Sequence, residues 1–110
     1  MAITKIEVSD MILAGTLFTE SGYDVEKSAE NLAELKGNII IEHLEGLFPG
    51  VEICADIAIQ MEDGKPWRLE VLVYNEKNEK NQEEANTILS QLTQKIAEGT
   101  ADRSWAVKVA

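Results

Sequence analysis

A chain of 110 residues with 45% hydrophobic and 27% charged side chains has the size and composition of one globular domain, so residues 1–110 are predicted to form a single domain. Its apolar content offsets the entropy of ordering, which excludes intrinsic disorder of the whole chain. Twenty acidic against ten basic residues give a net charge of −10. A surface this acidic repels nucleic-acid phosphates and anionic lipid headgroups, so we expect no nucleic acid and no membrane among the partners.

Localisation is predicted from the cysteine content and the N-terminus. Cys54 is the only cysteine, so the fold is expected not to depend on an internal disulfide. The first ten residues lack the basic start of a secretory signal, and the apolar residues 11–18 are far fewer than the roughly 20 that span a bilayer. We therefore expect a cytoplasmic protein.

The N-terminal segment is predicted to contain a strand. Ile6 and Val8 are typical of a strand with one buried face. Residues 11–18 either extend this strand past a bulge or form a second, extra strand, and the sequence leaves both possibilities open.

A long helix is predicted next, with Asp24 as its N-cap and its end before Pro49. Gly37 lies in its middle, so the segment is one helix, a kinked helix or two helices, and the isoleucines at 39–41 also allow a strand. We favour helix because Glu42 and Glu45 then share a polar side. The residues of its apolar face are Val25, Ala29, Leu32, Ile40, Leu44 and Leu47.

Two alternating segments, 51–61 and 67–74, predict neighbouring strands joined as a hairpin. A three-residue loop at 62–64 pairs Ile59 with Trp67 and Ile57 with Leu69, which places both apolar rows on one face. In this register Gly64 is expected to adopt a positive φ at a bulge. The apolar row of the first strand is Val51, Ile53, Ala55, Ile57, Ile59 and Met61.

A second helix is predicted from Asn81, its N-cap with Glu84 three residues later, to a stop at Gly99. The chain then closes with a short strand from Trp105 to Val109. Both tryptophans are expected to lie in the core. The element order predicts an α+β domain with ferredoxin-like βαββαβ topology, in which two helices cover one face of an antiparallel sheet.

Metal and cofactor sites are not predicted. One histidine and one cysteine cannot complete a tetrahedral zinc site, and no calcium-binding loop or glycine-rich phosphate loop occurs. We therefore expect no metal and no cofactor.

His43 is the one candidate catalytic residue. On a continuous helix, His43 and Lys36 lie near the centre of the apolar face, where a polar group needs a partner. His43 is then either a general base in a pocket between helix and sheet or a residue at the edge of the core. Cys54 has acidic and apolar expected neighbours, Glu52, Asp56 and Leu72, which favour an inert thiol.

The predicted sheet face away from the helices is amphipathic. The hairpin register places Asp56 opposite Glu70 and Glu52 opposite Tyr74, so like charges face each other unless Arg68, another cation or a partner offsets them. Leu72 and Tyr74 add apolar surface to this face. Such a mixed face is a common place for two subunits to meet.

We therefore expect a non-enzymatic, acidic, cytoplasmic homodimer that binds a protein partner, for example a basic protein, or a small ligand. The expected interface residues are Leu72, Tyr74, Asp56, Glu70 and Arg68. The alternative is a small metal-independent enzyme of the dimeric α+β barrel type, whose pocket would include His43, Lys36, Trp67 and Tyr74.

Overall fold

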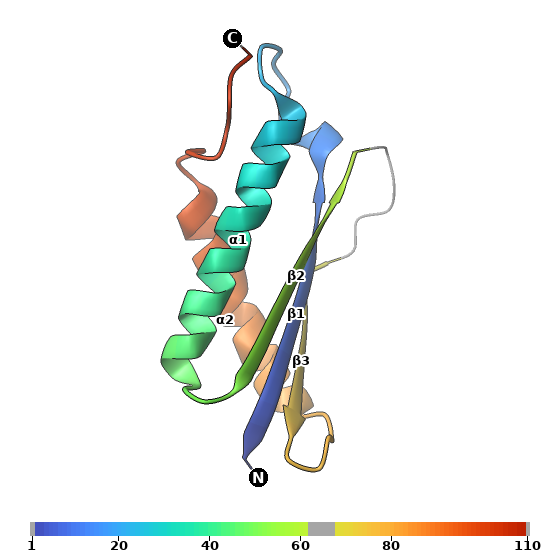
Figure 1. Ribbon diagram of the computed structural model, residues 1–110, viewed down its shortest axis with the longest axis vertical. Coiled ribbons are helices and arrows are strands. Elements are labelled where there is room, and N and C mark those ends of the chain that lie inside the picture. Colours follow the sequence, from blue (N-terminus) through green and yellow to red (C-terminus); the bar gives the residue numbers. More distant parts are fainter. Residues whose placement is uncertain (1, 62–67, 110) are drawn as a thin grey trace.

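The computed structural model describes residues 2–61 and 68–109, and within them the protein has an α+β fold. Its strands are β1 (Ile3–Leu13), β2 (Glu52–Gln60) and β3 (Glu70–Asn75), and its helices are α1 (Val25–Leu47) and α2 (Gln82–Thr100), with a short 3₁₀ turn at Ala14–Thr16. Both helices lie on the same side of the sheet (Figure 1). With principal extents of 52 × 27 × 18 Å, the molecule is an elongated slab of two layers.

The sheet has the strand order β2-β1-β3, with β1 parallel to β2 and antiparallel to β3. The predicted all-antiparallel sheet is therefore wrong, as is the pairing of Ile57 with Leu69, because β1 lies between their strands. The predictions for Gly64 and Trp67 concern residues outside the part of the chain that the structure describes. The N-terminal segment is settled as one long strand followed by the 3₁₀ turn, with no second strand at 14–18.

Helix length explains the parallel pairing. The 23 residues of α1 extend about 34 Å, close to the roughly 36 Å of the 11-residue β1. The chain therefore returns along α1 to the level at which β1 began, and β2 can start beside β1 and run in the same direction. Period-two alternation is the same whichever neighbour a strand has, so it did not distinguish this arrangement from a hairpin.

Helix α1 is continuous through Gly37, so the alternatives of two helices or a strand at 39–41 are wrong. Its predicted N-cap is confirmed, because the Asp24 carboxylate accepts a hydrogen bond of 3.0 Å from the backbone N–H of Lys27. Ile40 and Leu44 are fully buried, as expected for the apolar face, whereas Leu47 is 51% exposed because the last helical turn reaches beyond the core.

Helix α2 begins as predicted, with the Asn81 side chain accepting a hydrogen bond from the backbone N–H of Glu84 at 3.1 Å. Gly99 does not end the helix, which continues to Thr100. A Cβ at Gly99 would lie 2.6 Å from Cδ1 of Ile39. The glycine therefore allows α1 and α2 to approach closely, which is a packing role and not that of a helix stop.

The main core lies between the sheet and the two helices. The central strand contributes Ile6 and Val8, at 0% and 2% exposure, because β1 has a strand on each edge and the helix layer above it. The other buried members are Val71 and Val73 of β3, Ile40 and Leu44 of α1, and Ala85, Ile88, Leu92 and Ile96 of α2.

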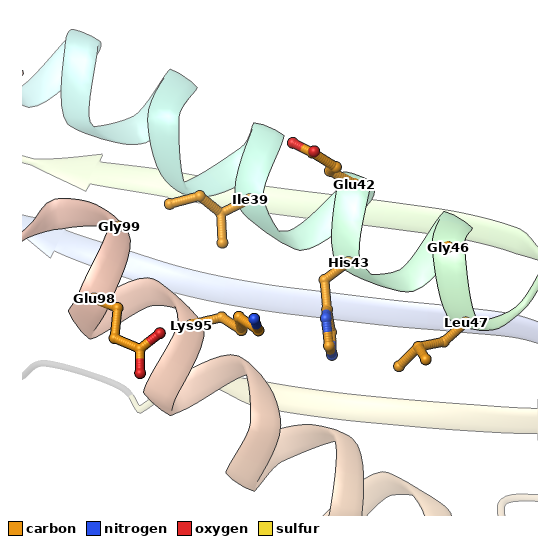
Figure 2. A pocket seen from close by; sticks show the side chains of 8 residues that line it. All are labelled: Ile39, Glu42, His43, Gly46, Leu47, Lys95, Glu98 and Gly99. Atoms are coloured by element: carbon orange, nitrogen blue, oxygen red, sulfur yellow. The ribbon is translucent and has the colours of Figure 1, made fainter.

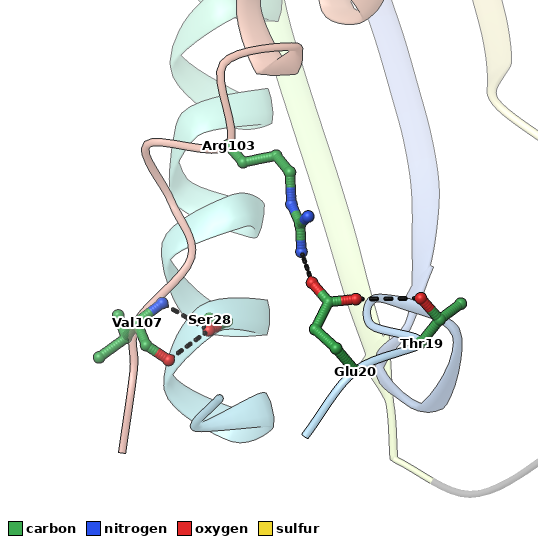
Figure 3. Close-up of polar contacts among 5 residues, drawn as sticks. All are labelled: Thr19, Glu20, Ser28, Arg103 and Val107. Atoms are coloured by element: carbon green, nitrogen blue, oxygen red, sulfur yellow. Dashed lines mark hydrogen bonds and ion pairs between the residues drawn. The ribbon is translucent and has the colours of Figure 1, made fainter. Parts of the chain in front are cut away.

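The C-terminal segment does not form the predicted fourth strand among the described residues, and the ferredoxin-like arrangement is therefore not observed in them. Instead the segment packs beside the N-terminal half of α1, where the buried Ser28 hydroxyl accepts a hydrogen bond of 2.9 Å from the Val107 N–H (Figure 3). The backbone N–H of Asp24 donates to the Val107 carbonyl at 2.8 Å. Trp105 is buried, as expected, and its indole N–H donates to the Thr100 carbonyl.

An ion pair joins this segment to the loop before α1. Arg103 contacts the Glu20 carboxylate at 3.1 Å, and the Thr19 hydroxyl donates to the other Glu20 oxygen at 3.0 Å (Figure 3). The Thr19 hydroxyl, the backbone N–H of Glu20 and Arg103 together lower the pKa of Glu20. Because the folded-state pKa is lowered, this contribution to stability is present above the usual glutamate range and is lost as the pH falls through the folded value.

A second ion pair lies beneath α1. Asp10 is on the helix-facing side of β1 and only 8% exposed, and its Oδ2 is 3.1 Å from Nζ of Lys36. Its Oδ1 accepts a hydrogen bond from the Met11 N–H. This contact gives Lys36 the partner that its position on the apolar face required.

We expect Lys36→Met to lower the free energy of unfolding by about 1–3 kcal/mol, because the Asp10 carboxylate would remain buried without its cation. Urea denaturation measures this loss. The double variant Asp10→Leu/Lys36→Met should recover most of it, since neither charge then remains buried. Equal stability of Lys36→Met and wild type would contradict the role of this pair.

We expect Ser28→Ala to cost about 1–2 kcal/mol, because the Val107 N–H would lose its acceptor in a partly buried position. Hydrogen exchange should show the Val107 amide becoming less protected, while amides of the sheet change little. The matched control is Ser90→Ala, at an exposed position of α2. Unchanged protection at Val107 would refute the proposed anchoring of the C-terminal segment.

Candidate functional site

The structure separates the two polar residues that the sequence placed together on α1. Lys36 reaches towards the sheet and contacts Asp10, whereas His43 faces α2, and its Nε2 lies 3.2 Å from Oε1 of Gln91. The predicted pocket containing both residues is therefore not formed. Gly37 does not interrupt the helix, so the two positions share nearly the same face. They lie about 10 Å apart along the helix axis, and this axial separation gives them different surroundings.

His43 lines an open groove of about 570 Å³ between the two helices. Figure 2 shows His43 and Lys95 extending into the space between α1 and α2, while Glu42 points away from α2. The remaining lining residues are Ile39, Gly46, Leu47, Glu98 and Gly99. The groove lies between helices on the outer side of the helix layer, and not between helices and sheet as the enzyme hypothesis required.

The contacts of His43 do not favour acid–base catalysis. A catalytic histidine is usually oriented by a carboxylate or placed beside a nucleophile in a site that excludes water. Here the contacting group is the amide of Gln91, at an exposed position. The hydrogen bond is better explained as a polar contact that links the two helices at the edge of the core.

The sheet face away from the helices carries the other predicted residues. Asp56 and Glu70 both lie beside Ser9, which pairs with Asp56 on β2 and with Glu70 on β3. The predicted direct Asp56–Glu70 contact is therefore wrong, because the two residues are separated by two strand spacings, about 10 Å. Their repulsion is correspondingly weaker.

The next rows of this face follow the same arrangement. Glu7 lies between Cys54 and Leu72, and Lys5 lies between Glu52 and Tyr74. The predicted pairing of Glu52 with Tyr74 is therefore wrong, because Lys5 lies between them and pairs with each. We call this surface the open face; its members are Lys5, Glu7, Ser9 and Met11 of β1, Glu52, Cys54, Asp56 and Ala58 of β2, and Glu70, Leu72 and Tyr74 of β3.

Among the members of the open face, Lys5 is the residue with a positive charge. Its Nζ lies 2.8 Å from Oε1 of Glu7 and 5.9 Å from the centre of the Tyr74 ring. Hydrogen bonding to Glu7 and the charge of that carboxylate raise the pKa of Lys5. Arg68 is exposed just before β3, and no contact within residues 2–61 and 68–109 joins it to Asp56 or Glu70.

A hollow of about 250 Å³ lies on the open face where Ser9 leaves space between larger neighbours. Glu7 and Asp56 supply carboxylates at its wall, and Cys54 and Leu72 supply less polar surface. Leu72 is half-buried, and Cys54 is exposed. Ser9 and Glu7 were not among the residues predicted from the sequence, although the alternation of polar residues at 5, 7 and 9 with Ile6 and Val8 placed them on one face.

Comparisons with known proteins assign no function. The chain matches no protein-family model, no curated protein and no solved structure. Within the described part of the chain, no three histidine, cysteine or acidic side chains are grouped so that they could hold a metal ion. No helix of that part is long and apolar enough to cross a membrane. The open face and the groove hold most of the site residues that were predicted from the sequence.

We expect Cys54→Ser to leave the free energy of unfolding within about 0.5 kcal/mol of wild type, since the thiol is exposed and packs in no core. Thermal denaturation monitored by circular dichroism checks this. A large loss of stability would show that the thiol has a structural role that its exposure does not indicate.

Proposed function

We propose that this chain is a non-enzymatic binding module that docks a basic segment of a partner protein on its open face. The observation that supports this proposal is the hollow at Ser9, with the Glu7 and Asp56 carboxylates at its wall, on a sheet face that neither helix covers (Figure 1). A lysine or arginine side chain fits such a site, because its methylenes can contact Leu72 while its charge meets the carboxylates.

The size of the hollow favours a side chain over a small-molecule ligand. Pockets for small molecules usually have volumes of about 300–1,000 Å³ and bury most of the ligand, whereas this hollow is about 250 Å³. Extended peptides place every second side chain on one surface, so one basic residue could enter the hollow while its neighbours contact the acidic rim.

Charge distinguishes a basic partner from a face-to-face dimer. The open face carries one basic member, Lys5, and four acidic members, which are Glu7, Glu52, Asp56 and Glu70. Two such faces in contact would bring acidic groups together, at a cost in free energy, whereas a basic segment would neutralise them and would be attracted by the net charge of −10. We place this binding in the cytoplasm, where the exposed Cys54 would stay reduced.

We expect a lysine-rich peptide to bind wild-type protein and to shift NMR signals of residues around Ser9, with affinity falling as salt is added. Asp56→Asn/Glu70→Gln should weaken this binding by about three- to tenfold, since each exposed ion pair contributes up to about 1 kcal/mol.

The control for this experiment removes equal charge elsewhere. Glu30→Gln/Glu83→Gln changes exposed carboxylates on the two helices, so it should weaken binding much less. Equal losses in the two double variants would mean that only net charge matters and would overturn the proposal, as would NMR shifts located in the helix groove.

A further inference from the structure

The helix-facing row of β2 is apolar but incompletely covered. Ile53, Ala55 and Ile57 are only half-buried, and Ile59 is 37% exposed. Of the residues beside them on β1, Ile6, Val8 and Ile12 are at most 2% exposed and Asp10 is 8% exposed. The sequence predicted that this row is buried, whereas in the structure it is only partly buried.

The cause is the position of β2 at the edge of the sheet. Within residues 2–61 and 68–109, β2 pairs with β1 alone. The outer edge of β3, in contrast, is partly closed by the chain that follows it, because the Asn81 N–H donates to the Val73 carbonyl at 2.8 Å and Tyr74 forms a bridge with Lys80. The two edges of the sheet therefore differ, and β2 has the open one.

β2 also lacks the features by which edge strands avoid pairing with other chains. Its nine residues contain no proline and no lysine, and its register with β1 is continuous from Glu52 to Gln60 without a bulge. Its two charged residues, Glu52 and Asp56, are on the open face, so no charge interrupts the helix-facing row. A long, regular and apolar edge of this kind is a template for another strand.

We propose that two copies of this chain pair through β2 in antiparallel orientation and form a continuous six-stranded sheet. A second copy is the occupant that matches this edge, because it supplies an equally apolar row on the same side of the sheet. Pairing would cover Ile57 and Ile59 and would satisfy the free backbone groups of β2. This inference is independent of the proposed function, since it concerns an edge of the sheet and not the open face.

Charge disfavours several registers of the pair. With the two-fold axis at Ile57, Asp56 lies opposite Ala58 of the second copy and Cys54 lies opposite Gln60. An axis at Asp56 would place two carboxylates directly opposite each other, which is unfavourable.

Two other registers are also less favourable than the one centred on Ile57. An axis at Cys54 would place Glu52 opposite Asp56, which again opposes two carboxylates. An axis at Ala55 would keep Asp56 diagonal to Glu52 of the second copy and would leave the exposed Ile59 nearer the end of the contact. Of these four registers, the one centred on Ile57 opposes no two carboxylates directly and brings only the two Asp56 side chains diagonal to each other. It also places the exposed Ile59 beside Ala55 of the second copy.

Sedimentation tests the interface. Wild-type protein should be a dimer at tens of micromolar, and Ile59→Lys should be a folded monomer, because a lysine in the helix-facing row of an edge strand opposes pairing. The control Val109→Lys changes a residue that is 63% exposed and remote from β2, and it should remain a dimer. Circular dichroism verifies that both variants fold.

Disulfide formation tests the register. In Gln60→Cys, each Cys54 would face the introduced thiol of the second copy, so mild oxidation should link most chains into covalent dimers on a non-reducing gel. The wild-type thiols would lie about 20 Å apart across the pair and should not link. The control Glu70→Cys carries its new thiol on β3 and should also stay unlinked.

Three results would overturn the inference. The first is a wild-type monomer at tens of micromolar, and the second is a dimer that persists in Ile59→Lys. The third is a dimer dissociated by Leu72→Glu but not by Ile59→Lys, which would place the contact on the open face.

If Gln60→Cys fails to cross-link while Ile59→Lys dissociates the dimer, the proposed register is wrong. Binding of the lysine-rich peptide is measured separately, so its failure is distinguishable from that of the dimer.

Discussion

The whole structure depends on β1 having a strand on each of its edges. Every strand pairing in the described sheet includes β1, and its helix-facing residues Ile6 and Val8 are at most 2% exposed. This central position makes β1 the floor of the core and also the middle row of the open face, where Ser9 separates Asp56 from Glu70. The same strand therefore determines both the packing of the core on one face of the sheet and the spacing of Asp56 and Glu70 on the other face.

Much of the local structure could be predicted from the sequence because it depends on short-range chemistry. Asp24 and Asn81 cap helices as expected, since their side chains satisfy backbone N–H groups three residues ahead. The alternation in 52–60 and 70–74 gave the two faces of β2 and β3 correctly. Leu72, Tyr74, Asp56 and Glu70 were thus placed on the face away from the helices, where the structure has them.

The neighbours of each strand could not be predicted, because alternation is independent of what lies beside a strand. The short polar segment at 62–66 favoured a hairpin, whereas the match in length between α1 and β1 produced a parallel pair instead. This one difference moved Ser9 between the acids and left β2 at an edge. The contact of Lys36 with Asp10 was missed for a similar reason, since Asp10 lies in an N-terminal segment whose orientation depended on strand order.

The central place of β1 also has a consequence during synthesis. β1 leaves the ribosome before both of its partners, and the second of them, β3, is completed roughly 60 residues later, a delay of about 3–12 seconds at typical rates of translation. Throughout that interval the apolar side chains of β1 lack part of their cover. The nascent chain is therefore expected to need a chaperone most during the interval between completion of β1 and emergence of β3, and least once α2 has closed the core.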